Sequence, residues 1–297
     1  MTPRQVGLLG ALGALWGGSY LLIKYDLVDF SAPFVVFGRT ALGALVLLAV
    51  IRWQGGASLT ALRGQRGRPW LALGLGAVAI TAPFLLITLG ELEVPSGLTA
   101  VLIATAPLFV AMLAPFVDRT ETIGRRQGVG LLIGFGGVVL LVGVESVSSA
   151  GELLGAIAVV GAAACYAISS FVVKGPYRGV PSVVVSFLSV GAGAVLTVPA
   201  VLATLPDHVP GWRSVVSLVV LGAGGTALAF VIFYRLIAEV GAGRATLVSY
   251  LAPGLALLYG AALLDERITL AGAGGIALIL AGVFVASRGG VSRPESA

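Results

Sequence analysis

The sequence predicts an all-α integral membrane protein with ten transmembrane helices, arranged as two inverted five-helix repeats. Of its 297 residues 58% are hydrophobic and 10% are charged, and the mean hydropathy is +1.06. A soluble domain carries about 25% charged residues, because its surface must be polar. Apolar runs of roughly 20 residues recur, and each is long enough to cross about 30 Å of hydrocarbon. A backbone in lipid must satisfy its own hydrogen bonds, and the alternation typical of a β-barrel is absent, so these runs should be helices.

Ten apolar runs are separated by short connections that hold most of the charges, prolines and turn residues. The predicted spans are 6–24, 33–52, 70–90, 95–116, 126–144, 152–174, 181–204, 214–235, 242–263 and 268–287. When connections are assigned to alternating sides, fourteen Lys and Arg residues fall on the side of the two termini. Only Lys24, Arg213 and Arg267 fall on the other side, and Arg39 lies inside a span. Positive charge marks the cytoplasmic side, so we expect both termini in the cytoplasm and the protein in the cytoplasmic (inner) membrane.

The two halves of the chain resemble each other. Segment 94–108 aligns with 240–254, which matches Pro107 with Pro253, and Trp16-x-x-Ser19 aligns with Tyr166-x-x-Ser169. The offset stays between 145 and 150 residues, so we divide the chain into repeats 1–146 and 147–297. Because five is odd, the second repeat enters the membrane from the opposite side. Inverted repeats of this kind are typical of alternating-access transporters.

Several of these motifs resemble the drug/metabolite transporter superfamily, and specifically its EamA-type ten-helix branch. They are Trp16-Gly17-x-Ser19, Arg39, Pro107, Pro253 and the starts of the fifth and tenth spans around Glu121 and Glu266. The resemblance covers nearly the whole chain. It implies a basket of ten helices around a central cavity, with the fifth and tenth helices supporting packing or homodimer contacts. It also implies export or uptake of small metabolites such as amino acids, nucleosides, sugars or toxic organic compounds.

Arg39 is the most informative single residue, because it lies about 9 Å into its span at 1.5 Å per residue. An ionised side chain at that depth costs several kcal/mol unless it snorkels, pairs or faces water. One interpretation is a cavity-facing cation that holds an anionic group of the solute. The alternative is a structural arginine that reaches helix-terminal carbonyls or the membrane interface.

Two further groups of side chains are candidates for the cavity wall. Thr81, Phe84 and Thr88 share one face of the third span with Glu91. We interpret Glu91 as a solvated charge at the helix end, and the alternative is a proton or cation site. Aromatic rings beside hydroxyls suit an amphipathic solute, and they occur on matching faces of the first and sixth spans. These residues are Trp16, Ser19, Tyr20, Tyr166, Ser169 and Ser170. Hydroxyl-mediated helix packing is the alternative for these faces of the first and sixth spans.

Pro107 and Pro253 interrupt backbone hydrogen bonding at corresponding positions, and interrupted helices point to transport sites. Thr105, Ser249 and Tyr250 lie near these breaks as further solute contacts. Passive kinks are the alternative. We expect the two halves to rock about these prolines. Glycine motifs, including Gly13-x-x-x-Gly17 and Gly130-x-x-x-Gly134, predict close helix approach.

The remaining composition excludes several functional classes. A lone histidine, His208, and a lone cysteine, Cys165, exclude a His cluster for zinc and an internal disulfide. No basic soluble segment exists to bind nucleic acid, and no glycine-rich phosphate loop follows a strand. We expect no enzyme, no cofactor and no metal, and we find no buried acidic pair for proton coupling. The predicted function is a secondary transporter, an exporter of a small amino acid-like or other amphipathic solute. The alternative is a lipid-handling membrane protein or a non-transporting scaffold.

Overall fold

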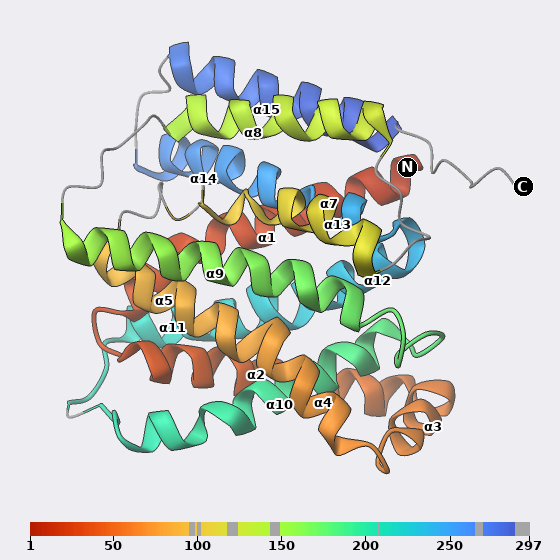
Figure 1. Ribbon diagram of the computed structural model, residues 1–297. Coiled ribbons are helices and arrows are strands. Elements are labelled where there is room, and N and C mark those ends of the chain that lie inside the picture. The colour runs from red at the N-terminus through yellow and green to blue at the C-terminus, as the bar shows by residue number, and fades with distance from the viewer. Residues whose placement is uncertain are drawn as a thin grey trace, which may run out of the picture.

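The first half of the chain forms helices wherever the sequence has long apolar runs. In this computed structural model, which describes residues 1–94, 99, 102–117, 124–142, 149–206, 208–264 and 270–288, the described elements are all helical (Figure 1). They begin with α1 (Pro3–Asp26), α2 (Ala32–Gln54) and the short α3 (Gly56–Gly64). One continuous run then comprises α4 (Pro69–Gly76), the π-helical η1 (Ala77–Thr81) and α5 (Ala82–Glu93), and it is followed by α7 (Ala106–Val117) and α8 (Arg125–Val142).

The second half has a similar order of elements. It comprises α9 (Ala150–Val172), α10 (Ser182–Leu202), a run of α11 (Trp212–Val220), π-helical η2 (Leu221–Leu228) and α12 (Ala229–Val240), then α13 (Ala242–Ala245), α14 (Val248–Leu264) and α15 (Leu270–Arg288). The prediction of an all-helical chain is confirmed for the described residues.

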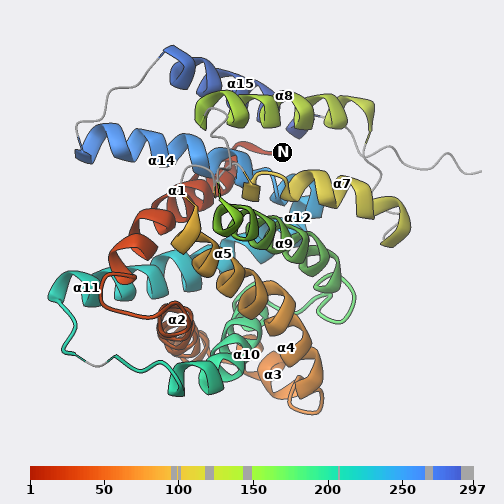
Figure 2. The same cartoon turned by 60° about the vertical axis from the view of Figure 1, so that its left-hand side comes forward.

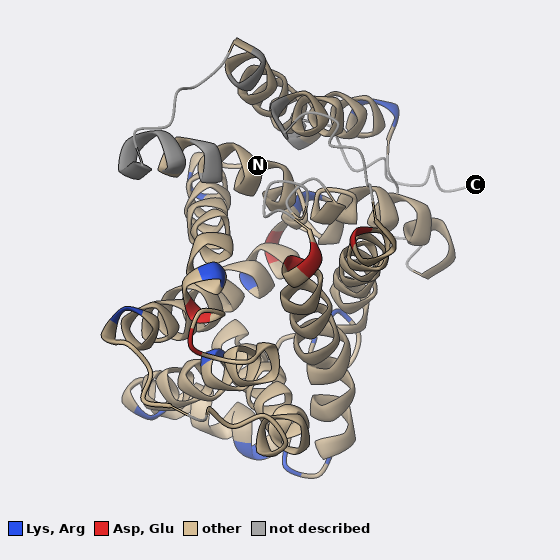
Figure 3. Cartoon of the chain, turned by 90° about the vertical axis from the view of Figure 1, so that its left-hand side faces the viewer, with Lys and Arg blue, Asp and Glu red and all other residues tan. Residues whose placement is uncertain are grey.

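Six helical stretches are long and apolar enough to cross a membrane. They are Pro3–Asp26, Ala32–Gln54, Pro69–Glu93, Ala150–Val172, Ser182–Leu202 and Trp212–Val240, and each coincides with a predicted span. The other four predicted spans contain α7, α8, α13 with α14, and α15, partly outside the described residues. The count of ten spans therefore stays a prediction. Charged residues are sparse along the described ribbon (Figure 3).

Local sequence signals explain where the helices begin and end. Thr2 and Gln5 form a reciprocal capping box at the start of α1, and Ser31 caps α2 through its side chain. Gly55 ends α2 with a positive φ of 60°, and Gly241 ends α12 with a φ of 86°. A side chain is strained in this backbone region, which explains glycine at both stops.

The π-helical segments η1 and η2 were not predicted. Each lies inside one of the two composite helices, between α4 and α5 or between α11 and α12. A π-helical turn widens the helix by one residue, and such turns occur preferentially at functional sites. Thr81 ends η1 and Thr226 lies within η2.

Helices of the two halves contact each other in reciprocal pairs. α2 packs on its counterpart α10, and α8 packs on its counterpart α15. α5 packs on α9, and the equivalent contact in the other direction is that of α1 with α11, η2 and α12. Likewise α1 contacts α14 as α9 contacts α7. Each contact either joins two corresponding helices or has an equivalent contact between the corresponding helices of the other half.

α8 and α15 lie side by side along one edge of the bundle, next to α14 (Figures 1 and 2). Glycines bring them together: a Cβ on Gly137 would lie 2.7 Å from the Ile279 nitrogen, and Gly282 directly faces the Gly134 backbone. In the first span, a Cβ on Gly13 would lie 3.0 Å from the Cβ of Leu251. The prediction that glycines permit close helix approach is confirmed at these positions.

Candidate functional site

A small cavity of about 40 Å³ lies in the centre of the bundle. It is lined by residues of α1, α2, α5, α7, α9, α12 and α14 and of the segments that precede α7 and α14. The lining residues are Trp16, Ser19, Tyr20, Ile23, Arg39, Phe84, Ile87, Ile103, Ala106, Tyr166, Phe233, Thr246, Ser249 and Ala252. This volume holds a few water molecules, whereas a pocket that holds a drug-sized ligand has about 300–1,000 Å³. The cavity is therefore too small for a drug-sized ligand in this structure.

Aromatic rings from both halves of the chain meet beside the cavity. The Trp16 and Tyr166 rings are stacked with centroids 6.2 Å apart, and Phe233 lies 5.1 Å from Trp16. Phe84 and Phe230 meet edge to face at 5.9 Å. These rings give the cavity an apolar wall with polar edges, which suits a solute that has both characters.

Arg39 is the charged residue in the cavity wall, and it is only 3% exposed. Its Nε donates a hydrogen bond of 3.0 Å to the Thr226 hydroxyl, which donates in turn to the Leu221 carbonyl oxygen. The guanidinium carbon lies 3.9 Å from the centroid of the Phe84 ring. A desolvated cation–π contact contributes about 2 kcal/mol. Neither contact neutralises the charge, so an anionic group of a solute is a favourable partner for Arg39.

The structure brings seven predicted cavity residues together: Trp16, Ser19, Tyr20, Arg39, Phe84, Tyr166 and Ser249. Thr105 and Ser170 lie outside the lining and donate to the Leu102 and Tyr166 carbonyl oxygens at 2.6 and 2.8 Å. Four other candidates also lie outside the lining. Thr81 donates to the Gly193 carbonyl oxygen at 3.4 Å, and Thr88 and Ser169 donate to carbonyls of their own helices at 2.8 and 2.9 Å. The Tyr250 side chain is fully buried against Gly134 of α8, with its hydroxyl unpartnered. For these four residues, the structure favours a packing role over a direct contact with the solute.

The two prolines lie beside the cavity without lining it. Pro107 occupies the first turn of α7, where proline is well tolerated, and Pro253 lies inside α14, where its missing N–H leaves a carbonyl without its helical donor. Ala106 and Ala252, the residues directly before them, line the cavity. Turns at residues 104–105 and 246–247 interrupt both helical runs. The gating role of the two prolines remains a prediction, and Glu121 and Glu266 lie outside the described residues.

The expectation for Glu91 was wrong. Its side chain is 1% exposed, and neither carboxylate oxygen has a hydrogen-bond partner. Asp26 is 0% exposed and equally unpartnered, so buried acids exist where none were expected. Both lie at helix ends, and their exposure depends on the neighbouring helices that cover them, which the linear sequence does not encode.

Sequence reasoning also missed part of the lining, including Phe233 and Thr246. Phe230 follows Phe84 by 146 residues, the same offset as the internal repeat, so the repeat itself carried a signal for this aromatic pair. Thr226 follows Thr81 by 145 residues in the same way. The partnership of Thr226 with Arg39 required the packing of η2 against α2.

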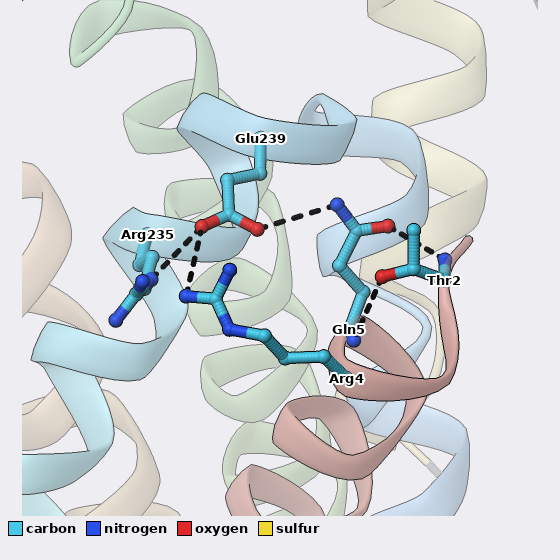
Figure 4. A network of polar contacts seen from close by, with 5 residues as sticks. All are labelled: Thr2, Arg4, Gln5, Arg235 and Glu239. Atoms are coloured by element: carbon cyan, nitrogen blue, oxygen red, sulfur yellow. Dashed lines mark hydrogen bonds and ion pairs between the residues drawn. The ribbon is translucent and has the colours of Figure 1, made fainter.

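The two ends of the bundle differ. At one end, the Lys24 ammonium donates a hydrogen bond of 2.6 Å to the Glu91 carbonyl oxygen. At the other, a vestibule of about 940 Å³ is lined by Lys174, Arg178, Arg235 and Glu239 among others. Glu239 accepts from Gln5 at 3.2 Å and pairs with Arg4 and Arg235 at 3.7 and 2.9 Å (Figure 4). The vestibule therefore lies at the end that carries the N-terminus.

Comparison with known proteins identifies relatives over most of the chain. The model of the EamA-like transporter family matches residues 5–143 and 153–288. The uncharacterized transporter YoaV of Bacillus subtilis is 25% identical, over 96% of this chain and 97% of that relative. A probable terminal-alkyne amino-acid exporter of Streptantibioticus cattleyicolor is 27% identical, over 95% of this chain and 93% of that relative. A solved crystal structure shares the fold with a TM-score of 0.78, at 22% identity over 96% of this chain and 97% of that chain.

Proposed function

The chain belongs to the EamA-like transporter family, and on that premise we propose that it exports a small amphipathic metabolite, of amino acid-like chemistry, across the cytoplasmic membrane by alternating access. The observation that carries this proposal is the buried Arg39 guanidinium in the wall of an aromatic cavity. A solute carboxylate binds to Arg39, while its apolar part lies against Trp16 and Tyr166. The name of the Streptantibioticus cattleyicolor exporter supports this solute class.

Alternating access is supported by the difference between the two ends. Lys24 and Lys174 correspond in the internal repeat, with an offset of 150 residues. Lys24 closes its end by bonding to α5, whereas Lys174 lines the wide vestibule together with α12, the counterpart of α5. The Lys24 end is thus bridged by a hydrogen bond, while a wide vestibule lies at the Lys174 end. An inverted pair of repeats exchanges these two arrangements when the carrier changes its accessible side.

The two-repeat organisation, with units 1–146 and 147–297, is supported by three independent features. The family model matches two successive segments of similar length. The helix contacts between the halves are reciprocal, and each half has one helix with a π-helical segment. We propose that the halves rock near Pro107 and Pro253, because the residues before both prolines line the cavity.

The vestibule and the charge distribution support the proposed direction of transport, which is export. The vestibule lies at the end of the N-terminus, and the positive-inside bias assigns that end to the cytoplasm. A solute that enters from the cytoplasm meets this wide opening first, whereas the opposite end is closed. Release outside requires opening of the Lys24 end. We propose no enzymatic step and no cofactor. The edge formed by α8 and α15 is the proposed homodimer contact.

Counterflow in proteoliposomes tests this function. Purified protein is reconstituted, the vesicles are loaded with unlabelled compound, and uptake of labelled amino acids, nucleosides and sugars is measured one class at a time. Protein-dependent exchange of an amino acid-like solute is the expected result. Exchange confined to nucleosides or sugars would contradict the solute class. Absence of exchange across the panel, from folded protein, would favour a lipid-handling protein or a scaffold.

A further inference from the structure

The end of the bundle that carries Lys24 holds two carboxyl groups sealed from water. Asp26 and Glu91 are 0% and 1% exposed, and none of their four carboxyl oxygens has a hydrogen-bond partner. Asp26 lies one turn beyond Ile23 in α1, and Glu91 lies one turn beyond Ile87 in α5. Because both isoleucines line the cavity, the carboxyls form the next layer between the cavity and this end.

Cations lie near the two carboxyls, but they bind elsewhere. The Lys24 ammonium donates to the main-chain oxygen of Glu91, and the Arg39 Nε donates to Thr226. Arg39 faces both acids from α2, and Lys24 faces Glu91 from α1. Neither cation forms an ion pair with either carboxyl, so both acids are sealed without a direct counter-ion.

Ser217 of α11 is a neutral side chain within hydrogen-bonding reach of Asp26. In this structure its hydroxyl proton is donated to the Leu22 carbonyl oxygen at 2.9 Å, so Asp26 competes with that carbonyl for the donor. Tyr20 of α1 faces Glu91, and Tyr166 of α9 faces Arg39. In the described part of the chain, the titratable and charged groups that face the two acids are therefore Lys24, Arg39 and Tyr20, while Tyr166 reaches them only through Arg39 and Tyr20.

A carboxylate without a donor costs several kcal/mol to bury, whereas a neutral carboxyl costs far less. The sealed arrangement is therefore more stable when the two carboxyls are protonated, and an arrangement that admits water is more stable when they are ionised. We propose that Asp26 and Glu91 form a proton-binding gate: this end stays shut while both carboxyls are protonated, and it opens as they release their protons to the adjoining solvent. The gate rests on the proposed transport function, because it controls access to the solute cavity.

The sign of the pH response follows from linkage. The shut arrangement binds more protons than the open one, so acidification favours the shut arrangement and alkalinisation favours the open one. Release of one proton changes the ratio of the two arrangements by up to tenfold for each pH unit, over the range in which the group titrates in only one of them. Two acids make the response steeper than one.

A distance measurement across this end tests the gate. Spin labels are attached at Val28→Cys, just beyond α1, and at Leu92→Cys, near the end of α5, with Cys165→Ala as the background. Both positions are exposed, at 75% and 59%. Pulsed electron resonance in proteoliposomes then gives the distance distribution at about pH 5.5 and about pH 8.5. We expect the ratio of long to short distances to rise by about tenfold or more at the higher pH.

The double variant Asp26→Asn with Glu91→Gln should keep the short distance at both pH values. Glu93→Gln removes an exposed acid two residues from Glu91 and is the matched control, which should keep the full response. If the double variant does not fold, each single variant should show a weaker response than the wild type. A wild-type distribution that ignores pH, or a pH response that persists in the double variant, overturns the gate.

Counterflow in the same vesicles separates this inference from the transport function. Exchange of an amino acid together with pH-independent distances would reject the gate and leave the transport function intact. Conversely, distances that depend on pH through Asp26 and Glu91, without exchange of any tested solute, would support the gate and count against the proposed transport.

Discussion

The side-chain nitrogen of Lys24 lies 2.6 Å from the carbonyl oxygen of Glu91, and this hydrogen bond joins the last turn of α1 to the last turn of α5. Lys24 itself is exposed, so this charge-assisted hydrogen bond contributes less than the roughly 1.5–3 kcal/mol of a buried one. It bridges the end of the bundle opposite the N-terminus, next to Ile23 and one turn beyond Ile87, which both line the cavity. Opening of this end must break it.

Loss of this bond should loosen the closed end. Lys24→Gln removes the ammonium donor. In a protein that also carries the reporter substitution Ile87→Cys, we expect the thiol to react about 5- to 20-fold faster with a membrane-impermeant maleimide added from this side. The measurement uses the Cys165→Ala background at one fixed pH. Arg213→Gln is the matched control, because Arg213 is an exposed cation at the start of α11. Equal labelling of Lys24→Gln and its parent would exclude a closing role for Lys24.

Arg39→Ala should lower the initial rate of counterflow of an exchanged anionic or zwitterionic solute by about 10- to 100-fold at low solute concentration. The variant removes the cation that the cavity presents to the solute. Arg39→Lys retains the charge but loses the planar stack on Phe84, so it should recover part of the rate. Arg52→Ala, an exposed position of the same helix, should transport normally. Unchanged affinity and rate in folded Arg39→Ala would show that Arg39 does not bind the solute.

Gly282→Ala should destabilise the protein, because the new methyl group would overlap the backbone of Gly134 in the facing helix. Backbone atoms cannot move aside as a flexible side chain does, so the free energy of unfolding should fall by about 1–3 kcal/mol. A thermal melt in detergent measures the change. Gly136→Ala is the control: its side chain would meet nothing within 4 Å, so the better helix propensity of alanine should leave stability equal or slightly raised. Equal melting of both variants would contradict close α8–α15 packing.

Asp29 should give the folded protein an acid-sensitive contact. The hydroxyl of Ser214, then His208 and the Gly211 N–H, hold the pKa of the Asp29 carboxyl below its ordinary value of 3.8. Because the folded pKa is the lower one, this stabilisation is present above the ordinary value and is lost as the pH falls through the folded value. Wild type should therefore lose more thermal stability than Asp29→Asn as the pH falls below about 4.

The difference between the two melts at each pH isolates Asp29 from other acids. His208→Gln provides the control, since it removes one of the partners and keeps the carboxyl. Its acid response should lie between those of wild type and Asp29→Asn. Parallel pH profiles of wild type and Asp29→Asn would mean that the contact does not stabilise the fold.

Several features of the fold could be predicted from the sequence because lipid leaves a chain few choices. An apolar run of about 20 residues must satisfy its backbone as a helix, and six predicted spans coincide with helices that are long enough to cross. Arg39 was found because a charged side chain inside a span is costly unless it faces water or a partner. Trp16 and Phe84 were found because they are aromatic residues on polar faces of their spans. Tyr166 was found through its repeat partner Trp16. All four line the cavity.

By itself, the sequence determined the helical membrane class and the family motifs, and it placed aromatic and charged residues on inward faces, because these depend on composition and local periodicity. Only the tertiary structure decided that Thr226 binds Arg39, that Glu91 is buried and that Lys24 bridges one end while a wide vestibule lies at the other. These properties depend on which helices cover a given residue. The reciprocal helix packing and the Lys24 bond determine that coverage, and both join residues far apart in the chain.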